Sequence, residues 1–313
     1  MTQFQPQLQT PSASSKPEDV VRSRRRYMII NGDDFGFSSG VNQAIIDAHQ
    51  RGVLTSTSLM VTGQAFEEAV ALAKAHPNLG VGLHLTLGKG RSVLPHSQIP
   101  HLVDLDGNFS NQPNRAGVYY QLNASARREI PLEIRAQLEK FRATGLPLSH
   151  VDGHLHMHSH PVILGALVKL ADEFNIKVIR LPSEELKFTL NLDRSDLQTK
   201  LSWSFIFTGL RLYGEGVLKS RGVGFVDRVY GLLQSGRMTE DYLLGLIPQI
   251  QANVVEIYSH PAIAIPGEPV NSPIGLGQAE LEALVSDRVR ETILSSGFEL
   301  TNYNHWERVS SEQ

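Results

Sequence analysis

The sequence contains no cysteine, which excludes disulfide bonds, thiolate metal sites and cysteine nucleophiles. Any bound metal ion must therefore be held by His, Asp or Glu side chains. No segment has the form of a signal peptide, and no apolar run approaches the roughly 18 to 20 residues that cross a bilayer. These absences favour a cytoplasmic protein without a transmembrane segment.

The chain also lacks an excess of charge of either sign, with 29 Lys and Arg against 32 Asp and Glu. Nucleic-acid-binding domains usually carry a basic excess, so we expect no nucleic-acid partner. The 313 residues, 41% of them hydrophobic, have an ordinary globular composition. They suffice for one large domain or two small ones.

Residues 1–24 are rich in Gln, Ser, Thr and Pro and are predicted to form a disordered tail. From 25 to 306 the chain alternates short apolar runs with segments of helical spacing, which is typical of βα units. Roughly seven or eight such units favour a single irregular (β/α) barrel of the TIM-barrel type over an open doubly wound sheet. We expect strands near 27–30, 53–61, 81–87, 148–152, 177–181, 254–258 and 298–303, and helices near 38–50, 64–76, 131–144, 161–174, 239–250 and 278–295.

Two segments fit this alternation poorly. Residues 88–126 are rich in Gly, Pro and Asn and read as one long loop, for which a lid over a binding site is our hypothesis. Residues 199–214 carry an apolar cluster from Trp203 to Tyr213. We interpret this cluster first as a core helix, and alternatively as an apolar substrate wall or a peripheral membrane contact.

Carboxylates and imidazoles occur at the predicted strand ends, which form the catalytic face of α/β barrels. Asp33 and Asp34 follow the first strand, His84 lies in the third, and His260 follows the strand at 254–258. The backbone can turn at a strand end, so both carboxylates can reach one site. One would hold a cation and the other would act as a general base, although Asp and Gly also favour simple turns.

The strongest signal is the tract from His150 to His160, which holds five of the twelve histidines. Neutral imidazole is a common metal ligand, and alternate residues of an extended segment point the same way. We therefore expect His154, His156 and His158 to face one pocket. A divalent ion bound by one carboxylate and two imidazoles suits amide hydrolysis, with Asp33 taking a proton from water and His260 donating one to the amine.

With these motifs the sequence resembles the YdjC-like (ChbG-like) carbohydrate deacetylases. The matching stretches occur in the family's order and are Ile29 to Ser38, Gly52 to Ser58, Val81 to Leu85, His150 to His158 and Ser259 to Pro261. The resemblance covers residues 27–303 and implies an irregular (β/α) barrel with one divalent metal ion. It also implies removal of an acetyl group from an N-acetylated sugar.

By this resemblance Asp34, His84 and His154 are metal ligands, Asp33 is the catalytic base and His260 is the general acid. We add His156, His158 and Arg180 as candidate substrate-binding residues. The family's metal is magnesium or zinc, and two imidazole ligands suit zinc or another transition metal better than magnesium.

Two further stretches, Gly90 to Phe109 and Phe141 to Pro147, resemble the hopanoid-biosynthesis-associated (HpnK) members of the family. That resemblance implies an N-acetylglucosaminyl hopanoid as the substrate. The alternatives are another metal-dependent amidohydrolase or phosphoesterase, and a non-catalytic sugar-binding protein. A homodimer is expected by analogy with similar barrels.

Overall fold

The computed structural model describes residues 25–271, 273 and 275–310, so the predicted disordered tail lies outside the described residues. Their strands form one parallel sheet in the order β4-β3-β2-β1-β6-β5, and β7 pairs with the first residues of β1. The strands are β1 (Arg26–Phe35), β2 (Ser56–Leu59), β3 (Gly80–Leu85), β4 (Val151–Gly153), β5 (Arg228–Tyr230), β6 (Val254–Ser259) and β7 (Phe298–Thr301).

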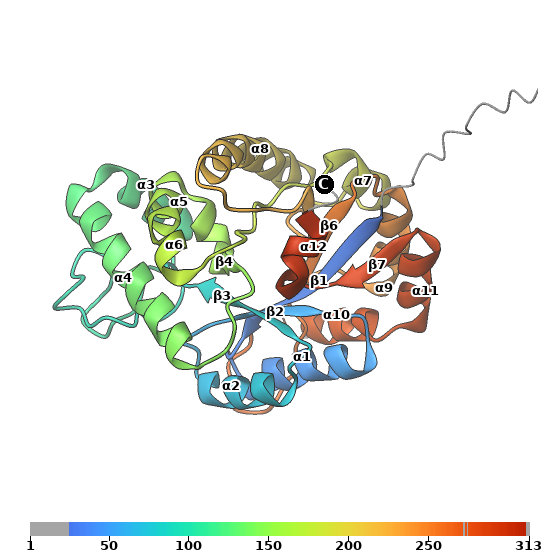
Figure 1. Cartoon of the computed structure of the whole chain (residues 1–313), viewed down its shortest axis with the longest axis horizontal. Coiled ribbons are helices and arrows are strands. Elements are labelled where there is room, and N and C mark those ends of the chain that lie inside the picture. Colours follow the sequence, from blue (N-terminus) through green and yellow to red (C-terminus); the bar gives the residue numbers. More distant parts are fainter. Residues whose placement is uncertain (1–24, 272, 274, 311–313) are drawn as a thin grey trace, which may run out of the picture.

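Helices surround this curved sheet (Figure 1). The α-helices are α1 (Ser39–Arg51), α2 (Phe66–Ala75), α3 (Pro113–Leu122), α4 (Ala124–Ala143), α5 (Pro161–Leu167), α6 (Ala171–Phe174), α7 (Leu186–Leu192), α8 (Leu197–Lys219), α9 (Glu240–Leu246), α10 (Leu276–Leu284), α11 (Asp287–Ser295) and α12 (Trp306–Ser310). The short 3-10 helices are η1 (His154–Ser159), η2 (Val168–Leu170), η3 (Ile247–Gln249) and η4 (Tyr303–His305).

The two edges of the sheet are linked by isolated bridges. Val151 of β4 bridges to Ile179, and Ser183 bridges to Val229 of β5. The predicted irregular (β/α) barrel is therefore confirmed, whereas the expected regular strand at 177–181 is wrong. No ladder forms there because this segment meets each neighbour at single residues.

The central strand β1 is buried along nearly its whole length, because other strands pair with both of its sides. Its apolar run from Tyr27 to Ile30 is what a strand covered on both faces requires. Burying a side chain such as Ile29 contributes about 1.5–3 kcal/mol to folding. The next helix begins where the sequence predicts, because the Ser38 hydroxyl accepts a hydrogen bond from the backbone N–H of Val41.

The segment 88–126 is not one long loop, because α3 and α4 both begin within it. Helix α4 starts before Pro131 and contains it, although proline is more usual in the first turn. Residues 88–112 are anchored to α4: Glu133 accepts hydrogen bonds from the backbone of Val93 and Leu94, and Glu129 accepts one from His101. None of the described residues of 88–126 lines the cavity at Asp33 and Asp34 described below, so the lid hypothesis finds no support.

Helix α8 contains the whole apolar cluster at 199–214, and the expectation of a core helix is wrong. Its buried residues are Lys200, Arg211, Gly214 and Leu218, while its large apolar side chains are mostly exposed. No helix in the described part of the chain is long and apolar enough to cross a membrane. The expected helix at 278–295 is two helices. Helix α10 ends at Leu284, and the hydroxyl of Ser286 caps the start of α11 by accepting a hydrogen bond from the backbone N–H of Val289.

Candidate active site

The adjacent carboxylates Asp33 and Asp34 reach one site because β1 is irregular at its carboxyl end. The register between β1 and β2 shifts between Gly32 and Phe35, and Asp34 has a left-handed backbone with φ of 68°. On a regular strand the two side chains would point to opposite faces of the sheet. The bulge re-aims them, as bulges beside active sites commonly do.

Asp34, His84 and His154 form a compact set of potential metal ligands. Asp34 Oδ1 lies 3.0 Å from His154 Nδ1 and 3.3 Å from His84 Nε2. One ligand atom from each residue lies within 4.8 Å of the others. Asn271 Nδ2 donates to the second oxygen, Asp34 Oδ2, at 3.1 Å. One carboxylate and two imidazoles with this spacing fit a divalent transition metal such as zinc.

The charges around this set favour a cation beside the carboxylate of Asp34. Burial by itself would raise the pKa of Asp34, but His154 and His84 outweigh it and hold the pKa well below the usual range. Burial likewise opposes protonation of His84, but the carboxylates of Asp152 and Asp34 raise its pKa to about 10. The site therefore stabilises positive charge beside Asp34, and a divalent ion supplies the same charge.

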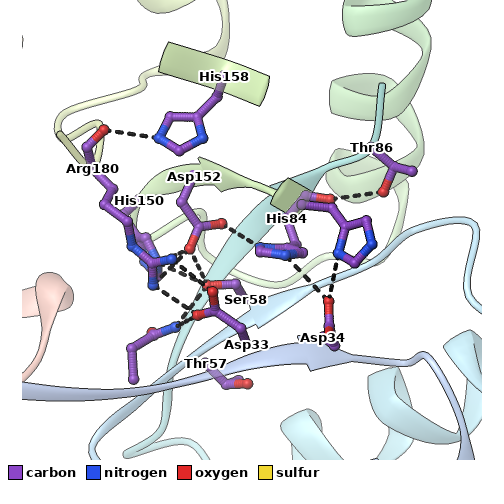
Figure 2. A network of polar contacts seen from close by, with 12 residues as sticks. Asp33, Asp34, Thr57, Ser58, His84, Thr86, His150, Asp152, His158 and Arg180 are labelled. Atoms are coloured by element: carbon purple, nitrogen blue, oxygen red, sulfur yellow. Dashed lines mark hydrogen bonds and ion pairs between the residues drawn. The ribbon is translucent and has the colours of Figure 1, made fainter. Parts of the chain in front are cut away.

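Behind His84 lies Asp152, whose role the sequence did not reveal. Asp152 Oδ1 accepts a hydrogen bond from His84 Nδ1 at 2.8 Å, and its other oxygen accepts one from Ser58 Oγ at 2.6 Å (Figure 2). A carboxylate in this position fixes the orientation and tautomer of a metal-binding imidazole. It leaves His84 Nε2 facing Asp34.

Arg180 is fully buried among three carboxylates. It donates to both oxygens of Asp33 at 2.8 Å, and its Nη2 lies 2.8 Å from Asp152 Oδ2 and 2.5 Å from Glu256 Oε1. Burial alone would lower the pKa of Arg180, but these carboxylates raise it well above the usual value. Asp33, His84 and Asp152 are also close enough to hold a metal, yet the guanidinium of Arg180 already pairs with both of these carboxylates.

A cavity of about 200 Å³ opens over these residues. Its lining includes every residue that we predicted as a metal ligand or catalytic group, namely Asp33, Asp34, His84, His154 and His260. His260 directly follows β6, and its backbone N–H donates to the buried carboxylate of Glu280 at 2.5 Å. That hydrogen bond fixes the chain where it leaves the strand.

The histidine tract is not extended, because Leu155 and His156 have left-handed backbones in the turn of η1. His156 does line the cavity, and its Nε2 lies 2.8 Å from the hydroxyl of Tyr258. His158 instead turns away and donates from Nε2 to the carbonyl of Arg180 at 3.0 Å. The side chains of His158 and Arg180 are fully buried outside the cavity lining, so direct contact with a substrate does not fit them.

Several residues of the site carried no clear signal in the sequence. Asp152 lies within the histidine tract, two residues before His154. The available clue to its role was its position on β4, beside the histidines. Asn271 and Trp203 also line the cavity, but neither lies at the end of a strand. Asn271 does not stand out in the sequence by type or by spacing, whereas Trp203 belongs to the apolar cluster that we interpreted alternatively as a substrate wall.

Residues 27–295 match the family model of the YdjC-like proteins. The chain belongs to the YdjC-like family. It is 33% identical over 280 residues to carbohydrate deacetylase 2 of Listeria innocua, covering 88% of this chain and 97% of that protein. It is 48% identical over 151 residues to a carbohydrate deacetylase of Brevibacillus brevis, a match that spans 48% of this chain and 58% of that protein.

A solved structure also resembles this member of the YdjC-like family. It is an Enterococcus faecalis protein provisionally described as a cellobiose-phosphate cleavage protein. The two chains are 27% identical with a TM-score of 0.67, and the match covers 90% of this chain and 99% of the other. The likeness extends over the whole barrel.

Proposed function

We propose that this protein is a metal-dependent deacetylase that hydrolyses the amide bond of an N-acetylated sugar and releases acetate. The observation that carries the proposal is the single cavity that joins a ligand set to a separate carboxylate and an imidazole. The ligand set is Asp34, His84 and His154, and the separate groups are Asp33 and His260. The names of the curated relatives support a sugar as the substrate.

The residues present fit a divalent ion, with zinc favoured over magnesium by the two imidazoles. Asp34, His84 and His154 would hold the ion, which would supply Lewis-acid chemistry for the acetyl carbonyl and for water. Asp152 holds His84 in the orientation that this role requires.

Asp33 acts as the general base that takes a proton from the attacking water. Its Oδ1 accepts hydrogen bonds from Asn31 and Arg180, whereas its Oδ2 accepts one from Arg180. Oδ2 therefore keeps an acceptor site for the proton. Arg180 is a positioning residue, because its two parallel hydrogen bonds fix the plane of the carboxylate.

His260 acts as the general acid. Hydrolysis breaks the bond between the acetyl carbon and the sugar nitrogen, and the departing amine must receive a proton. His260 lines the same cavity as Asp33, and its backbone is held by Glu280. The two groups thus share one small cavity, which lets one remove a proton and the other deliver one.

The substrate in this proposal is an N-acetylglucosamine-type oligosaccharide or glycolipid. Trp203, on an exposed apolar helix, lines the cavity and favours an amphiphile such as an N-acetylglucosaminyl hopanoid. A cytoplasmic location and a homodimer stay predictions.

Acetate release from N-acetylglucosamine oligomers, with and without a chelator, tests the proposal. We expect release by the wild type that the chelator abolishes, and none by His154→Ala, because a metal ligand is lost. His305→Ala, which removes an exposed imidazole, is the matched control and keeps full activity. Release that survives both the chelator and His154→Ala would refute the metal-dependent mechanism. An intact metal site without release would point to another acetylated substrate, tested next with a glycolipid.

A further inference from the structure

The polarity of helix α8 is reversed. Two of its three cationic side chains turn inward: Arg211 donates to the carbonyls of Leu181 and Val226, and Lys200 donates to Asp193. Between residues 197 and 213 the exposed positions include no Asp, Glu, Lys or Arg. They include instead the large apolar side chains Leu197, Leu201, Trp203, Phe205, Ile206, Leu212 and Tyr213, which we call the α8 face.

Such a face needs a partner to cover it. Helices on a protein surface usually bury their apolar stripe and expose charge. Phe205 is 84% exposed and Leu212 is 68% exposed, although both lie on an ordered helix of 23 residues. Figure 1 shows α8 at the outer edge of the molecule. Contiguous exposed apolar residues of this kind mark contact with another apolar surface.

The α8 face is continuous with the catalytic cavity. Trp203 stacks on Phe207, with 5.7 Å between ring centroids, and Phe207 packs edge-on against His156 at 5.6 Å. Trp203 and His156 both line the cavity that holds Asp33 and Asp34. The apolar surface therefore begins at the mouth of the cavity.

We propose that the α8 face docks this protein onto the surface of a lipid bilayer, with the helix lying in the interface. The face combines aromatic and aliphatic side chains with small polar ones, and interfacial helices place such a face at the boundary of headgroups and acyl chains. A second protein on this face would cover Trp203 and with it the edge of the cavity. A bilayer instead holds amphiphiles whose headgroups can enter that cavity.

Docking itself goes beyond the proposed function and does not depend on it. The consequence that the cavity meets a lipid-linked acetylated sugar does rest on the proposed function. The first test therefore contains no substrate and no assay of hydrolysis, so that the two proposals fail separately.

The test is co-sedimentation of the full chain with phosphatidylcholine vesicles. We expect the wild type to bind and Phe205→Asp to bind about tenfold more weakly or worse, because an aromatic side chain that would enter the bilayer is replaced by a charge. Leu105→Asp is the matched control: Leu105 is also 84% exposed, but it lies on the segment anchored to α4. It should bind as the wild type does. Leu212→Asp repeats the test if circular dichroism shows that Phe205→Asp is misfolded.

Tryptophan fluorescence gives a second readout. The chain has two tryptophans, and Trp306 is buried while Trp203 is partly exposed on the α8 face. We expect vesicles to shift the emission to the blue in the wild type and in Leu105→Asp, but not in Phe205→Asp. Three results would each overturn the proposal: no vesicle binding by the wild type, equal loss in both variants, or a wild-type dimer that Phe205→Asp dissociates without any vesicle binding.

Discussion

Asp33 and Asp34 are adjacent in the sequence and equally buried, yet the structure surrounds them with opposite partners. Asp33 faces the guanidinium of Arg180, which is permanently charged, so Asp33 has a cationic partner without any bound metal ion. Asp34 faces the imidazoles of His84 and His154, which are potential metal ligands. The comparison indicates how the environment of a carboxylate can set its role, and it underlies the proposed division into Asp33 as base and Asp34 as metal ligand.

The two regions also differ in how open they are. Arg180, Asp152 and Glu256 are fully buried, and their mutual contacts close the region behind Asp33. The region around Asp34 opens into the cavity through His154, which is partly exposed. A closed charge cluster holds geometry, whereas an open ligand set can admit an ion and a substrate.

The largest effect is expected from Arg180→Met, which breaks the closed region. Three carboxylates would then be buried without their cation, so the free energy of unfolding should fall by about 3–5 kcal/mol. Arg228→Met is the control, because the Arg228–Glu185 pair is partly exposed and should contribute at most about 1 kcal/mol. Urea unfolding measures both, and equal stabilities of the two variants would contradict this account of the cluster.

A smaller effect is expected from Asp152→Asn, which weakens the link between the two regions. His84 would lose its anionic acceptor, so the affinity for a divalent ion should fall by about 10–100-fold. Ser58→Ala removes one hydroxyl donor from Asp152 and should weaken binding by less than about tenfold. Calorimetric titration with zinc decides the point. An unchanged affinity in Asp152→Asn would mean that His84 is oriented by other groups.

The smallest effect is expected from His158, which burial keeps neutral. His84 differs from it because neighbouring carboxylates raise the pKa of His84. Burial lowers the pKa of His158 from its ordinary value of 6.5 to about 4. As the pH falls below about 6.5 the unfolded chain binds a proton before the folded chain does, so stability decreases toward pH 4. Between pH 7 and pH 5 this one group should cost about 1–2 kcal/mol.

Urea unfolding of His158→Gln across this pH range tests the assignment. The glutamine amide can still donate to the carbonyl of Arg180, but it does not titrate. Its stability should therefore decrease less than that of the wild type on acidification. Parallel pH profiles for the two proteins would show that His158 does not titrate as described.

Much of the site was predictable because it follows from strand ends. Asp33, Asp34, His84 and His260 were placed on the same edge of a parallel sheet, and the structure brings them to one cavity. Local pattern could not reveal the left-handed turn at Leu155 and His156, because no glycine marks it.

Long-range contacts account for the other differences. Arg180 lies 147 residues from Asp33, and its pairing depends on closure of the barrel. The apolar residues of α8 predicted a buried helix. They could not show whether another part of the chain covers it, and in the structure most of its large apolar side chains are exposed. Position in the fold, rather than sequence spacing, decided both outcomes.

The most direct test of the central claim compares Asp33→Asn with Asp34→Asn, measuring zinc binding by calorimetry and acetate release on the same preparations. The account predicts that Asp33→Asn binds the ion as the wild type does, while its acetate release falls by about 10²–10⁴-fold. It predicts that Asp34→Asn loses both ion binding and activity. If Asp33→Asn lost the ion, or Asp34→Asn kept it, the division of roles between the two carboxylates would be wrong.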